Sequence, residues 1–504
     1  MLTLAEAAQC TGGEWISQPL PPQTPLRGGA FDTRDLGQAQ IFFALAGEGA
    51  GADGHDHLPK LAGTGIQLAV VSRAVEIPGF AGAVLRVPDT LAAMAHMARH
   101  VVQKHAPRVV AVTGSFGKTT AKEEIAWVLS GAEWGPDAVL KSPGSHNNEI
   151  GIPITLLGLG PEHTVCVLEY SARKEGDIAY LCGIAPPDVA LLLAVGHAHI
   201  GVFGGLEQIY RAKGEIFTHM APGGLALAGS ADPRLRTLAG SARVQTFGPT
   251  AGHTAGEGTG ENAGEIAVDF AAEEITLDGE GRQVFTGVCA ADGTRLPLRA
   301  SLPGPHGCEP VLAAWAVARA LGLPDDVVTN RAGGAPAQKG RLRVLKASGG
   351  AALLDDCYNA SPETIINLIQ TLKARPERDK VLVLGPLAEL EEGLGETARR
   401  IAAALTAPLG RCIMHDPRSD ALYRQVLEHL PSGAPEMAFT ASQTDLVANL
   451  KGLDAPGRVV GIKGARSAHM ERAVAALQGT HVACTRHPCP WLRYCTDCDR
   501  LGQG

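Results

Sequence analysis

The stretch AVTGSFGKTTAKEEI, residues 111–125, runs an apolar strand into a glycine-rich turn and then into an amphipathic helix. Val112 stands where the full Walker pattern has its first glycine, but four residues of a phosphate-binding loop are in place: Gly114, Gly117, Lys118 and Thr119. Glycines let backbone N–H groups approach phosphate oxygens, and the helix adds its positive N-terminus. A surface turn can also contain glycine and lysine, but the strand–loop–helix context favours phosphate binding. The stretch alone does not separate a kinase, an ATPase and a ligase.

Size and composition describe a globular protein of several domains. The chain has 504 residues, of which 45% are hydrophobic and 19% charged, and this length exceeds that of one hydrophobic core. The net charge of −8 argues against a nucleic-acid-binding surface. No apolar run is long enough to span a bilayer, and the first residues lack the basic start of a signal peptide. We therefore expect a cytoplasmic monomer that binds neither nucleic acid nor membrane.

The order of apolar segments predicts an α/β protein of three domains. Short β-like runs fill residues 1–105, which we take as the first domain. Strands alternating with helices follow in residues 106–332, which indicates a parallel sheet, with a low-complexity loop at 249–263 and antiparallel strands after it. Residues 333–480 alternate in the same way. Residues 481–504 form a cysteine-rich tail.

Further motifs follow the phosphate loop in order. They are KSPGSHNNEIGIPITLLGL, LEYSARKEGDIAYL, AVGHAHIGVFGGLEQIYRAKGEIF, LPGPHG and KGRLRVLKASGGAALLDDCYNASPET. In this order and at these distances they resemble the Mur ligase family of ATP-dependent amide-forming enzymes. The resemblance covers residues 28–477 approximately. It implies an N-terminal nucleotide-sugar-binding α/β domain, a central P-loop-type ATPase domain with a parallel sheet, and a C-terminal Rossmann-like α/β domain.

The resemblance also implies a reaction. In the family, a substrate carboxylate attacks the γ-phosphate of ATP, and an amine then attacks the resulting acyl phosphate, with ATP and Mg²⁺ required. The strings NNEIGIP, GDIAYL and RAKGEIF are particularly close to members that add D-alanyl-D-alanine to UDP-N-acetylmuramoyl-tripeptide during peptidoglycan precursor synthesis. The expected partners are therefore a nucleotide-sugar peptide, or another carboxylate substrate, and an amino acid or dipeptide.

Four residues are candidates for catalysis and Mg²⁺ binding together with Lys118. Glu169 ends the strand TVCVLEY, where α/β sheets place ligands, although an isolated strand-end acid is also common. The Thr119 hydroxyl is placed to reach Mg²⁺. The resemblance implies that His199 binds metal and that CO₂ carbamylates Lys213, which would need an uncharged amine and hence a lowered pKa. Without the resemblance, Lys213 would be read as a helix-surface lysine.

The resemblance implies further contacts that isolated residues would not establish, since lysines, arginines and asparagine pairs are common on surfaces and in turns. ATP contacts are expected at Gly114, Ser115, Gly117, Lys118, Thr119, Thr120, Lys339, Arg341, Asp356, Tyr358 and Asn359. Substrate contacts are expected at Thr33, Arg34, Asp53, Gly54 and His55 for the uridine diphosphate, Asn147 and Asn148 for the sugar peptide, and Lys463 and Arg466 for the dipeptide.

The chain departs from the family pattern near the expected adenine site. In LPGPHGCEPVLAA, Pro305, Gly307 and Pro310 replace an arginine and two asparagines. Pro310 cannot donate a hydrogen bond but would fit the first turn of a helix. Tyr170 and Pro386 are further departures. These changes favour a paralogue acting on a different carboxylate, such as a secondary-metabolite or polymer precursor. A catalytically silent nucleotide-binding protein is a third alternative.

The tail CTRHPCPWLRYCTDC contains Cys484, Cys489, Cys495 and Cys498. Four thiolates at this spacing predict a structural Zn²⁺ site, with an iron–sulfur cluster as an alternative. The other interpretation is a frayed terminus with incidental cysteines. The high density of cysteines in so short a segment favours a metal.

Overall fold

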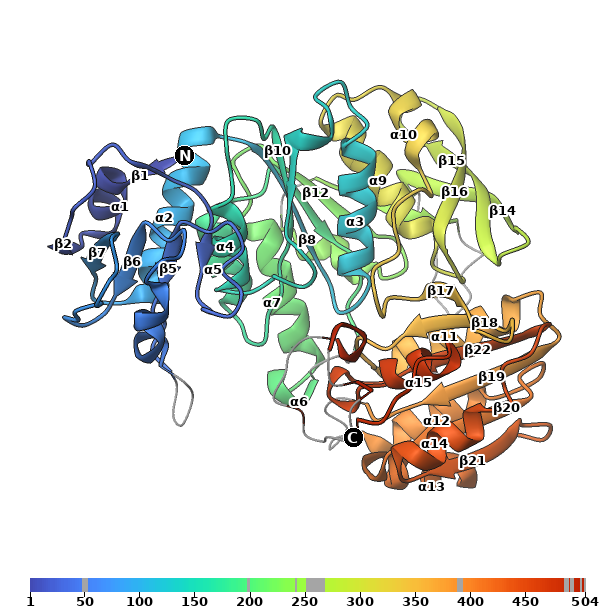
Figure 1. Ribbon diagram of the computed structural model, residues 1–504. Coiled ribbons are helices and arrows are strands. Elements are labelled where there is room, and N and C mark those ends of the chain that lie inside the picture. Colours follow the sequence, from blue (N-terminus) through green and yellow to red (C-terminus); the bar gives the residue numbers. More distant parts are fainter. Residues whose placement is uncertain are drawn as a thin grey trace. The chain divides into compact units, whose positions relative to one another are not determined.

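The computed structural model describes residues 1–47, 53–196, 200–240, 243–250, 268–387, 393–484, 489, 494–498 and 501–502. It forms two compact units (Figure 1). Unit 1 contains Met1–Ala194, Glu207–Gln245 and Ala314–Val327, and unit 2 contains Val195–Leu206, Thr246–Ala313 and Val328–Gly504. The domain boundaries expected after residues 105, 332 and 480 stay predictions. The loop expected at 249–263 falls mostly outside the described residues.

The first sheet belongs to unit 1 and uses the short β-like runs of the N-terminal segment. Its order is β2 (Glu14–Ser17), β7 (Ala83–Arg86), β6 (Leu68–Val71), β5 (Ile41–Phe43), β4 (Gly29–Ala30). All neighbours are parallel except β2 and β7. Helix α2 (Thr90–His105) follows β7, and its N-terminus is capped by Asp89, which accepts from two backbone N–H groups.

Unit 1 also contains five parallel strands that carry the phosphate loop. Their order is β12 (Leu225–Gly229), β11 (Val189–Leu192), β8 (Arg108–Thr113), β10 (Val165–Glu169), β9 (Val139–Lys141). The four strands other than the partly exposed edge strand β9 are largely apolar and buried, as expected where helices cover both faces of a parallel sheet. Their helices are α3 (Lys118–Leu129), α4 (Gly151–Leu156), α5 (Asp177–Ile184) and α7 (Leu206–Thr218). Glu169 is paired in register with Val112, so β8 and β10 end side by side.

Unit 2 contains the antiparallel strands expected after the low-complexity loop. Strands β14 (Phe270–Leu277), β15 (Arg282–Cys289) and β16 (Arg295–Pro303) form an antiparallel meander, and β13 (Val244–Pro249) is parallel to β14. Helix α9 (Cys308–Ala320) follows β16. Pro310 is the third residue of this helix, which confirms its expected place in a first turn.

The last sheet is doubly wound, as the alternation of strands and helices predicts. Its order is β17 (Arg343–Lys346), β18 (Ala352–Asp356), β22 (Arg458–Lys463), β19 (Asp379–Leu384), β20 (Arg411–His415), β21 (Glu436–Thr440), with only β17 antiparallel. Because strand side chains alternate between faces, Leu382 and Leu384 pack in one core and Val381 and Val383 in the other.

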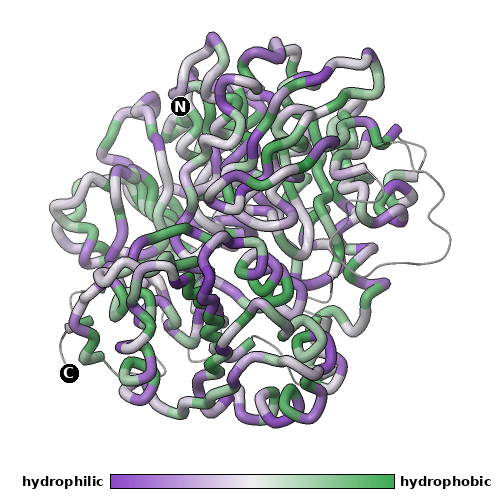
Figure 2. The backbone as a smooth tube through the Cα atoms, turned by 90° about the vertical axis from the view of Figure 1, so that its right-hand side faces the viewer, coloured by the Kyte–Doolittle hydropathy of each residue, from purple (hydrophilic) through white to green (hydrophobic). Residues whose placement is uncertain are grey.

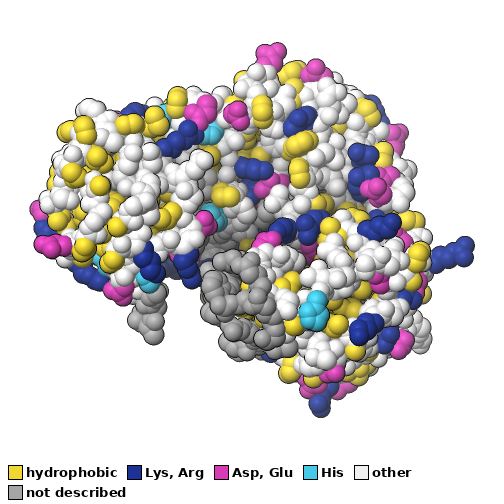
Figure 3. All heavy atoms as spheres, viewed as in Figure 1, with side chains coloured by type: hydrophobic (Ala, Val, Ile, Leu, Met, Phe, Trp, Pro, Cys, Tyr) yellow, Lys and Arg dark blue, Asp and Glu magenta, His cyan; other side chains and the backbone are white. Residues whose placement is uncertain are grey.

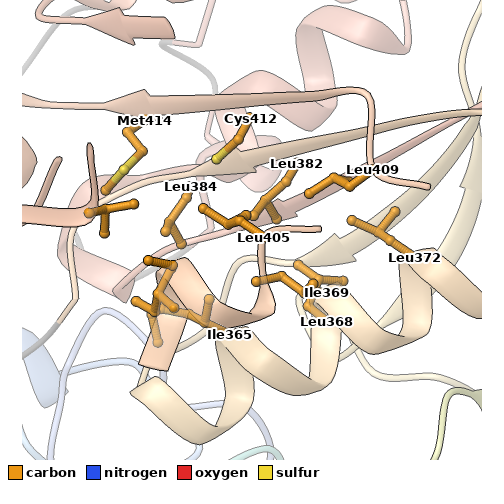
Figure 4. Packing of buried hydrophobic residues seen from close by; sticks show 14 of the residues in the cluster. Ile365, Leu368, Ile369, Leu372, Leu382, Leu384, Leu405, Leu409, Cys412 and Met414 are labelled. Carbon is orange, nitrogen blue, oxygen red and sulfur yellow. The ribbon is translucent and has the colours of Figure 1, made fainter. Parts of the chain in front are cut away.

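Helices cover both faces of this sheet. The core around Leu382 is completed by α11 (Pro362–Ala374), α12 (Leu394–Ala404) and α13 (Asp420–Glu428), and the opposite core by α14 (Gln443–Leu450) and α15 (Glu471–Leu477). Figure 4 shows Ile365, Leu368 and Leu372 of α11 turned toward the sheet. The remaining short strands and α-helices are β1 (Leu2–Thr3), α1 (Leu4–Thr11), β3 (Pro25–Leu26), α6 (Ile200–Phe203), α8 (Arg234–Thr237) and α10 (Asp325–Arg331). The 3₁₀ helices are η1 (Gly54–Leu61), η2 (Pro136–Ala138), η3 (Pro417–Ser419), η4 (Arg466–Ala468) and η5 (Cys495–Asp497).

Polar and apolar residues alternate along the chain, as Figure 2 shows by its succession of green and purple segments. On the face drawn in Figure 3, basic and acidic side chains are interspersed. Among the described residues, no helix has the length and apolar character that a membrane crossing requires. The seven cysteines from Cys10 to Cys412 are free thiols, and all but Cys10 are buried.

A buried lysine fixes the segment between β9 and α4. The Lys122 side chain is fully buried, and its Nζ donates to the carbonyl oxygens of Ser142 (2.7 Å) and Gly144 (2.8 Å). It also lies 3.0 Å from Glu123 Oε1, while the other oxygen of Glu123 is paired with the partly exposed Lys141 at 2.5 Å. An ammonium group with these partners is satisfied, whereas its removal would leave two carbonyls and part of a carboxylate without partners.

We therefore expect Lys122→Met to lower the free energy of unfolding by about 2–4 kcal/mol, because buried acceptors lose a charged donor. Lys141→Met is the matched control, since it removes the other cation beside Glu123 from a more exposed position, and its cost should stay below about 1 kcal/mol. Denaturant titration followed by circular dichroism measures both. Equal costs for the two variants would contradict the assigned role of Lys122.

Candidate functional site

The phosphate loop lies between the end of β8 and the start of α3. Gly114 and Gly117 have φ of +151° and +81°, which glycine adopts without strain. A Cβ on Gly114 would come within 3.2 Å of the Ala194 carbonyl oxygen, and that oxygen accepts from the Ser115 N–H at 2.8 Å. Lys118 Nζ donates to the Gly114 carbonyl at 2.8 Å. The loop is thus shaped by glycine and held by β11, with its lysine folded over it.

A hydroxyl and a carboxylate meet beside this loop. Thr119 Oγ1, in the first turn of α3, donates to Glu169 Oε2 at 2.8 Å, and both residues are buried. Asn147 Nδ2 donates to the other carboxylate oxygen of Glu169 at 2.8 Å, and the Glu169 N–H donates to Ser142 Oγ at 3.1 Å. Mg²⁺ binds oxygen ligands at about 2.1 Å in octahedral geometry, so neighbouring ligands lie about 3 Å apart. The Thr119 and Glu169 oxygens fit such an ion.

Lys213 lies on α7 and is 2% exposed, so the alternative of a surface lysine is wrong. Burial lowers its pKa to about 7, and the charge of Lys118 adds to the effect. The expected direction of the pKa shift is confirmed. Its neighbour Glu215 accepts from the N–H groups of Gly176 (2.6 Å) and Ala179 (3.0 Å) at the start of α5. These bonds tie α7 to α5 and position Lys213.

The two asparagines predicted to bind the sugar peptide have different surroundings. Asn147 contacts Glu169, as described above. Asn148 Oδ1 accepts from the Gly151 N–H at 2.9 Å, so this side chain caps the start of α4. Substrate binding by either residue stays a prediction. The predicted metal ligand His199 lies outside the described residues.

In the N-terminal sheet domain, Asp53 and His55 are hydrogen-bonded to each other. The Asp53 carboxylate accepts from the His55 N–H (2.9 Å) and lies 2.7 Å from His55 Nδ1, and the backbone bond to His55 is the main cause of the lowered pKa of Asp53. The Ser72 N–H donates to His55 Nε2 at 3.0 Å, so Nδ1 carries the ring proton. A Cβ on Gly54 would come within 2.8 Å of the Leu45 nitrogen. Asp53, Gly54 and His55 therefore fix the backbone of their own segment through these contacts.

Thr33 and Arg34 lie on the surface of the same sheet domain. Thr33 is half-buried, and the exposed Arg34 is paired with Asp32 at 2.6 Å. Arg34 is therefore accessible to an anionic ligand. Binding such a ligand would break its ion pair with Asp32, which is exposed and therefore contributes little to stability.

Residues predicted to meet ATP from the third domain gather at the ends of β18 and β22. Asp356 accepts from buried Lys463 at 2.5 Å, and Lys463 Nζ also donates to the Asn359 carbonyl at 2.9 Å. The Arg341 guanidinium lies 3.9 Å from the centre of the Tyr358 ring. Five predicted residues therefore form one neighbourhood. The role of Lys463 in dipeptide binding stays a prediction, because its ammonium group already has two partners.

The tail contributes two residues to this neighbourhood that sequence reasoning missed. Tyr494 Oη donates to the Lys339 carbonyl at 2.7 Å, and its ring lies 4.2 Å from the Arg466 guanidinium. Asp497 is paired with Lys339 Nζ at 2.5 Å. An aromatic residue inside a cysteine-rich segment carries no signal for such a contact, because the pairing joins residues about 155 positions apart.

The unusual adenine-side segment is tightly built. The Pro305 carbonyl accepts from Gln283 Nε2 at 2.9 Å, and a Cβ on Gly307 would lie 2.7 Å from that of Ala300. A side chain at position 307 does not fit this backbone. Tyr170 is fully buried and donates to the Ala185 carbonyl at 2.6 Å, so its hydroxyl is used within the core.

The predicted site of four tail cysteines is not among the groups of clustered ligand atoms in the described residues, and it stays a prediction. Among the described residues, the one group of three potential metal ligands is His469, Glu471 and Cys495, whose ligand atoms all lie within 4.8 Å of one another. Burial raises the pKa of the Cys495 thiol to about 11. Burial would also raise the pKa of Glu471, but the His469 ring and the Arg466 guanidinium lower it to about 2. The sequence indicated a metal through its four tail cysteines. In the structure, one of them, Cys495, lies beside His469 and Glu471 at the start of α15.

Comparisons with known protein families match two separate stretches of the chain. Residues 112–318 match the Mur ligase middle domain, and residues 340–466 match the Mur ligase, glutamate ligase domain. The UDP-N-acetylmuramoyl-tripeptide–D-alanyl-D-alanine ligase of Escherichia coli is 33% identical over 89% of this chain and 92% of its own, and the Bacillus subtilis enzyme of that name is 29% identical over 92% and 95%.

Solved structures agree with these matches. MurF from Acinetobacter baumannii has a TM-score of 0.79 at 28% identity, covering 95% of this chain and 99% of that one. MurF ligase from Thermotoga maritima in complex with ADP has a TM-score of 0.72 at 26% identity, covering 90% and 97%. The α/β sheets of this chain thus match the N-terminal, middle and C-terminal domains of these ligases. The protein belongs to the Mur ligase family of ATP-dependent acid–amino-acid ligases.

Proposed function

We propose that the protein joins D-alanyl-D-alanine to UDP-N-acetylmuramoyl-tripeptide through an acyl phosphate, a step of peptidoglycan precursor synthesis in the cytoplasm. The observation that carries the proposal is the 2.8 Å contact between the Thr119 hydroxyl and the Glu169 carboxylate beside the phosphate loop. The choice of substrates rests on the named activity of the E. coli and B. subtilis relatives.

The chain supplies the groups that the first step needs. The substrate carboxylate attacks the γ-phosphorus of ATP, the bond to the β-phosphate oxygen breaks, and ADP leaves. The N–H groups of residues 114–120 bind phosphate oxygens, and Lys118 Nζ exchanges the Gly114 carbonyl for a phosphate oxygen. Mg²⁺ held by Thr119 and Glu169 would supply positive charge against the transferring phosphoryl group.

Lys213 prepares a second anionic ligand. Its neutral amine attacks CO₂ and loses a proton, which leaves a carbamate able to bind a second Mg²⁺ together with His199. A pKa of about 7 leaves most of the amine neutral above that pH, whereas an ordinary lysine would be charged. Burial of the amine therefore serves the chemistry, because it makes the group nucleophilic.

The second step is amide formation. The dipeptide amine attacks the acyl carbon, phosphate leaves, and the amine proton passes to solvent or phosphate. Lys339, Arg341, Asp356, Tyr358 and Asn359 are assigned to ATP. Arg466 is assigned to the dipeptide carboxylate, and the surface around Arg34 to the uridine diphosphate. Each of the three ligands is thus assigned one arginine, and a guanidinium suits a carboxylate or phosphate partner.

A paralogous ligase is the second candidate. The observation that favours it is Gly307, where the backbone leaves no room for a side chain, together with Pro305 and Pro310 in the same segment. The adenine side is therefore built differently from the family pattern. Such an enzyme would keep the phosphate and metal groups and accept another carboxylate or amine.

The groups at the phosphate loop predict a graded mutant series. Lys118→Ala and Glu169→Gln should each lower ATP-dependent phosphate release by about 10²–10³-fold or more, because each removes a charge that acts on the transferring group. Thr119→Val should also lose activity, while Thr119→Ser keeps the hydroxyl and should stay within about tenfold. Phosphate release with excess MgATP measures the series, and circular dichroism checks folding. Full activity in Glu169→Gln would sink the assignment.

The substrates are tested by phosphate release with ATP, Mg²⁺, UDP-N-acetylmuramoyl-tripeptide and D-alanyl-D-alanine, together and singly. We expect release only when both substrates are present, with the UDP-linked pentapeptide detected by mass spectrometry. If the protein binds ATP but releases no phosphate, the peptidoglycan assignment fails and the paralogue stands.

Carbamylation of Lys213 should depend on pH. With a pKa of about 7, roughly 90% of the amine is neutral at pH 8 and roughly 10% at pH 6, so carbamate formation falls as pH decreases through 7. Carbon-13 NMR in labelled bicarbonate should show one carbamate signal at pH 8 that is absent in Lys213→Met. An equally strong signal in that variant would show that another amine reacts.

A further inference from the structure

Three different metal-binding side chains meet where the tail packs on the third domain. His469 and Glu471 lie at the start of α15, and Cys495 opens a short turn at residues 495–497. Cys495 Sγ lies 3.5 Å from His469 Nδ1, which lies 3.7 Å from Glu471 Oε1. The three residues are only 6%, 3% and 6% exposed for His469, Glu471 and Cys495.

These distances are those of a tetrahedral site. With zinc–sulfur bonds of about 2.3 Å and bonds to nitrogen or oxygen of about 2.0–2.1 Å, ligand atoms lie about 3.3–3.6 Å apart at tetrahedral angles. The nitrogen–sulfur separation agrees with this range, and the nitrogen–oxygen separation exceeds it only slightly.

The Glu471 carboxylate is incompletely satisfied. Its Oε1 accepts from Arg466 and from the Cys495 N–H at 3.1 Å, whereas Oε2 is buried and has no hydrogen-bond partner among the described residues. A buried carboxylate oxygen without a partner is costly. A cation bound between Glu471 and Cys495 would satisfy it.

Arg472 brings in a second sulfur. Its Nε donates to Cys495 Sγ at 3.3 Å and its Nη2 to Cys484 Sγ at 3.7 Å. A guanidinium that donates to two sulfurs orients them, as hydrogen bonds around metal ligands commonly do. Cys484 is also buried, and its sulfur shares the Arg472 guanidinium with Cys495, although it is not among the three ligand atoms that lie within 4.8 Å of one another. It is the nearest further thiol that the contacts offer as a fourth ligand.

We propose that His469, Glu471, Cys484 and Cys495 bind one Zn²⁺ ion, which fastens the tail to the third domain. Two thiolates and an imidazole select zinc over Mg²⁺, which prefers oxygen ligands. Four protein ligands leave no open position, so the site is structural.

The site has a consequence for the nucleotide-facing residues, and this part rests on the proposed function. Tyr494 immediately precedes Cys495 and contacts Lys339 and Arg466, and its ring centre lies 6.5 Å from that of Tyr358. Zinc therefore fixes the aromatic ring against residues assigned to ATP and to the dipeptide. Tyr494 is a positioning residue in this scheme.

The test is metal content of the full-length protein purified in Zn²⁺, and titration of the metal-free protein with Co²⁺. We expect one zinc per chain and the intense visible and near-ultraviolet bands of tetrahedral cobalt bound by thiolates. Cys495→Ser and Cys484→Ser should each weaken binding at least tenfold. Cys489→Ser and Cys498→Ser are matched controls from the same tail and should bind normally.

The outcomes are decisive in both directions. Binding that survives loss of Cys495 and Cys484 overturns the site, and binding lost equally in all four variants restores the four-cysteine arrangement. Should a variant fail to fold, alkylation of the wild type decides, because zinc must protect Cys484 and Cys495 more than Cys489. Metal binding is measured without substrates, so its failure leaves the ligase proposal standing.

Tyr494→Ala should raise KM for ATP more than it lowers kcat while zinc content is unchanged, and a kcat loss alone would overturn the positioning role.

Discussion

The contact between Thr119 and Glu169 is the constraint on which the site depends. It joins the first turn of α3 to the last residue of β10, so it requires two neighbouring parallel strands to end at the same level. The in-register pairing of Glu169 with Val112 provides that level. Asn147 and Ser142 then fix the carboxylate from the segment after β9, and buried Lys122 fixes that segment. The residues that stabilise this segment are therefore also the ones that fix the position of the Glu169 carboxylate.

Charged groups are treated differently in the two units. In unit 1, Lys213 is buried with a lowered pKa, to which the charge of Lys118 in the phosphate loop contributes. In the third domain, Lys463 is equally buried but keeps a carboxylate partner in Asp356. Arg341 and Arg466 instead lie over aromatic rings, an arrangement that leaves their N–H groups able to donate elsewhere. Burial therefore lowers the pKa of Lys213, whereas Lys463 is buried together with a carboxylate partner.

Much of the fold was predictable because its signals are local. Apolar runs such as those ending at Thr113 and Glu169 indicate buried parallel strands, and Pro310 correctly indicated a helix start. The phosphate loop was predicted from its glycines, Lys118 and Thr119 together with the strand before them and the helix after them. The tail could not, because the partners of Tyr494 and Cys495 are distant in sequence and are set by packing. The hydrogen bond from the Gly151 N–H to Asn148 Oδ1 was likewise not foreseen, because an asparagine in a turn can serve the backbone or a ligand and the sequence does not distinguish the two.

The parallel register of β10 also limits how the gene can change. Successive strand residues point to opposite faces, so inserting or deleting one residue between Val165 and Glu169 would turn the carboxylate away from α3 and exchange the side chains that pack on the two buried faces. The turn just before β10, at residues 160–163, can absorb a length change without moving that carboxylate. Lineages of this enzyme should therefore vary in length at such turns, while the strand itself admits substitutions only.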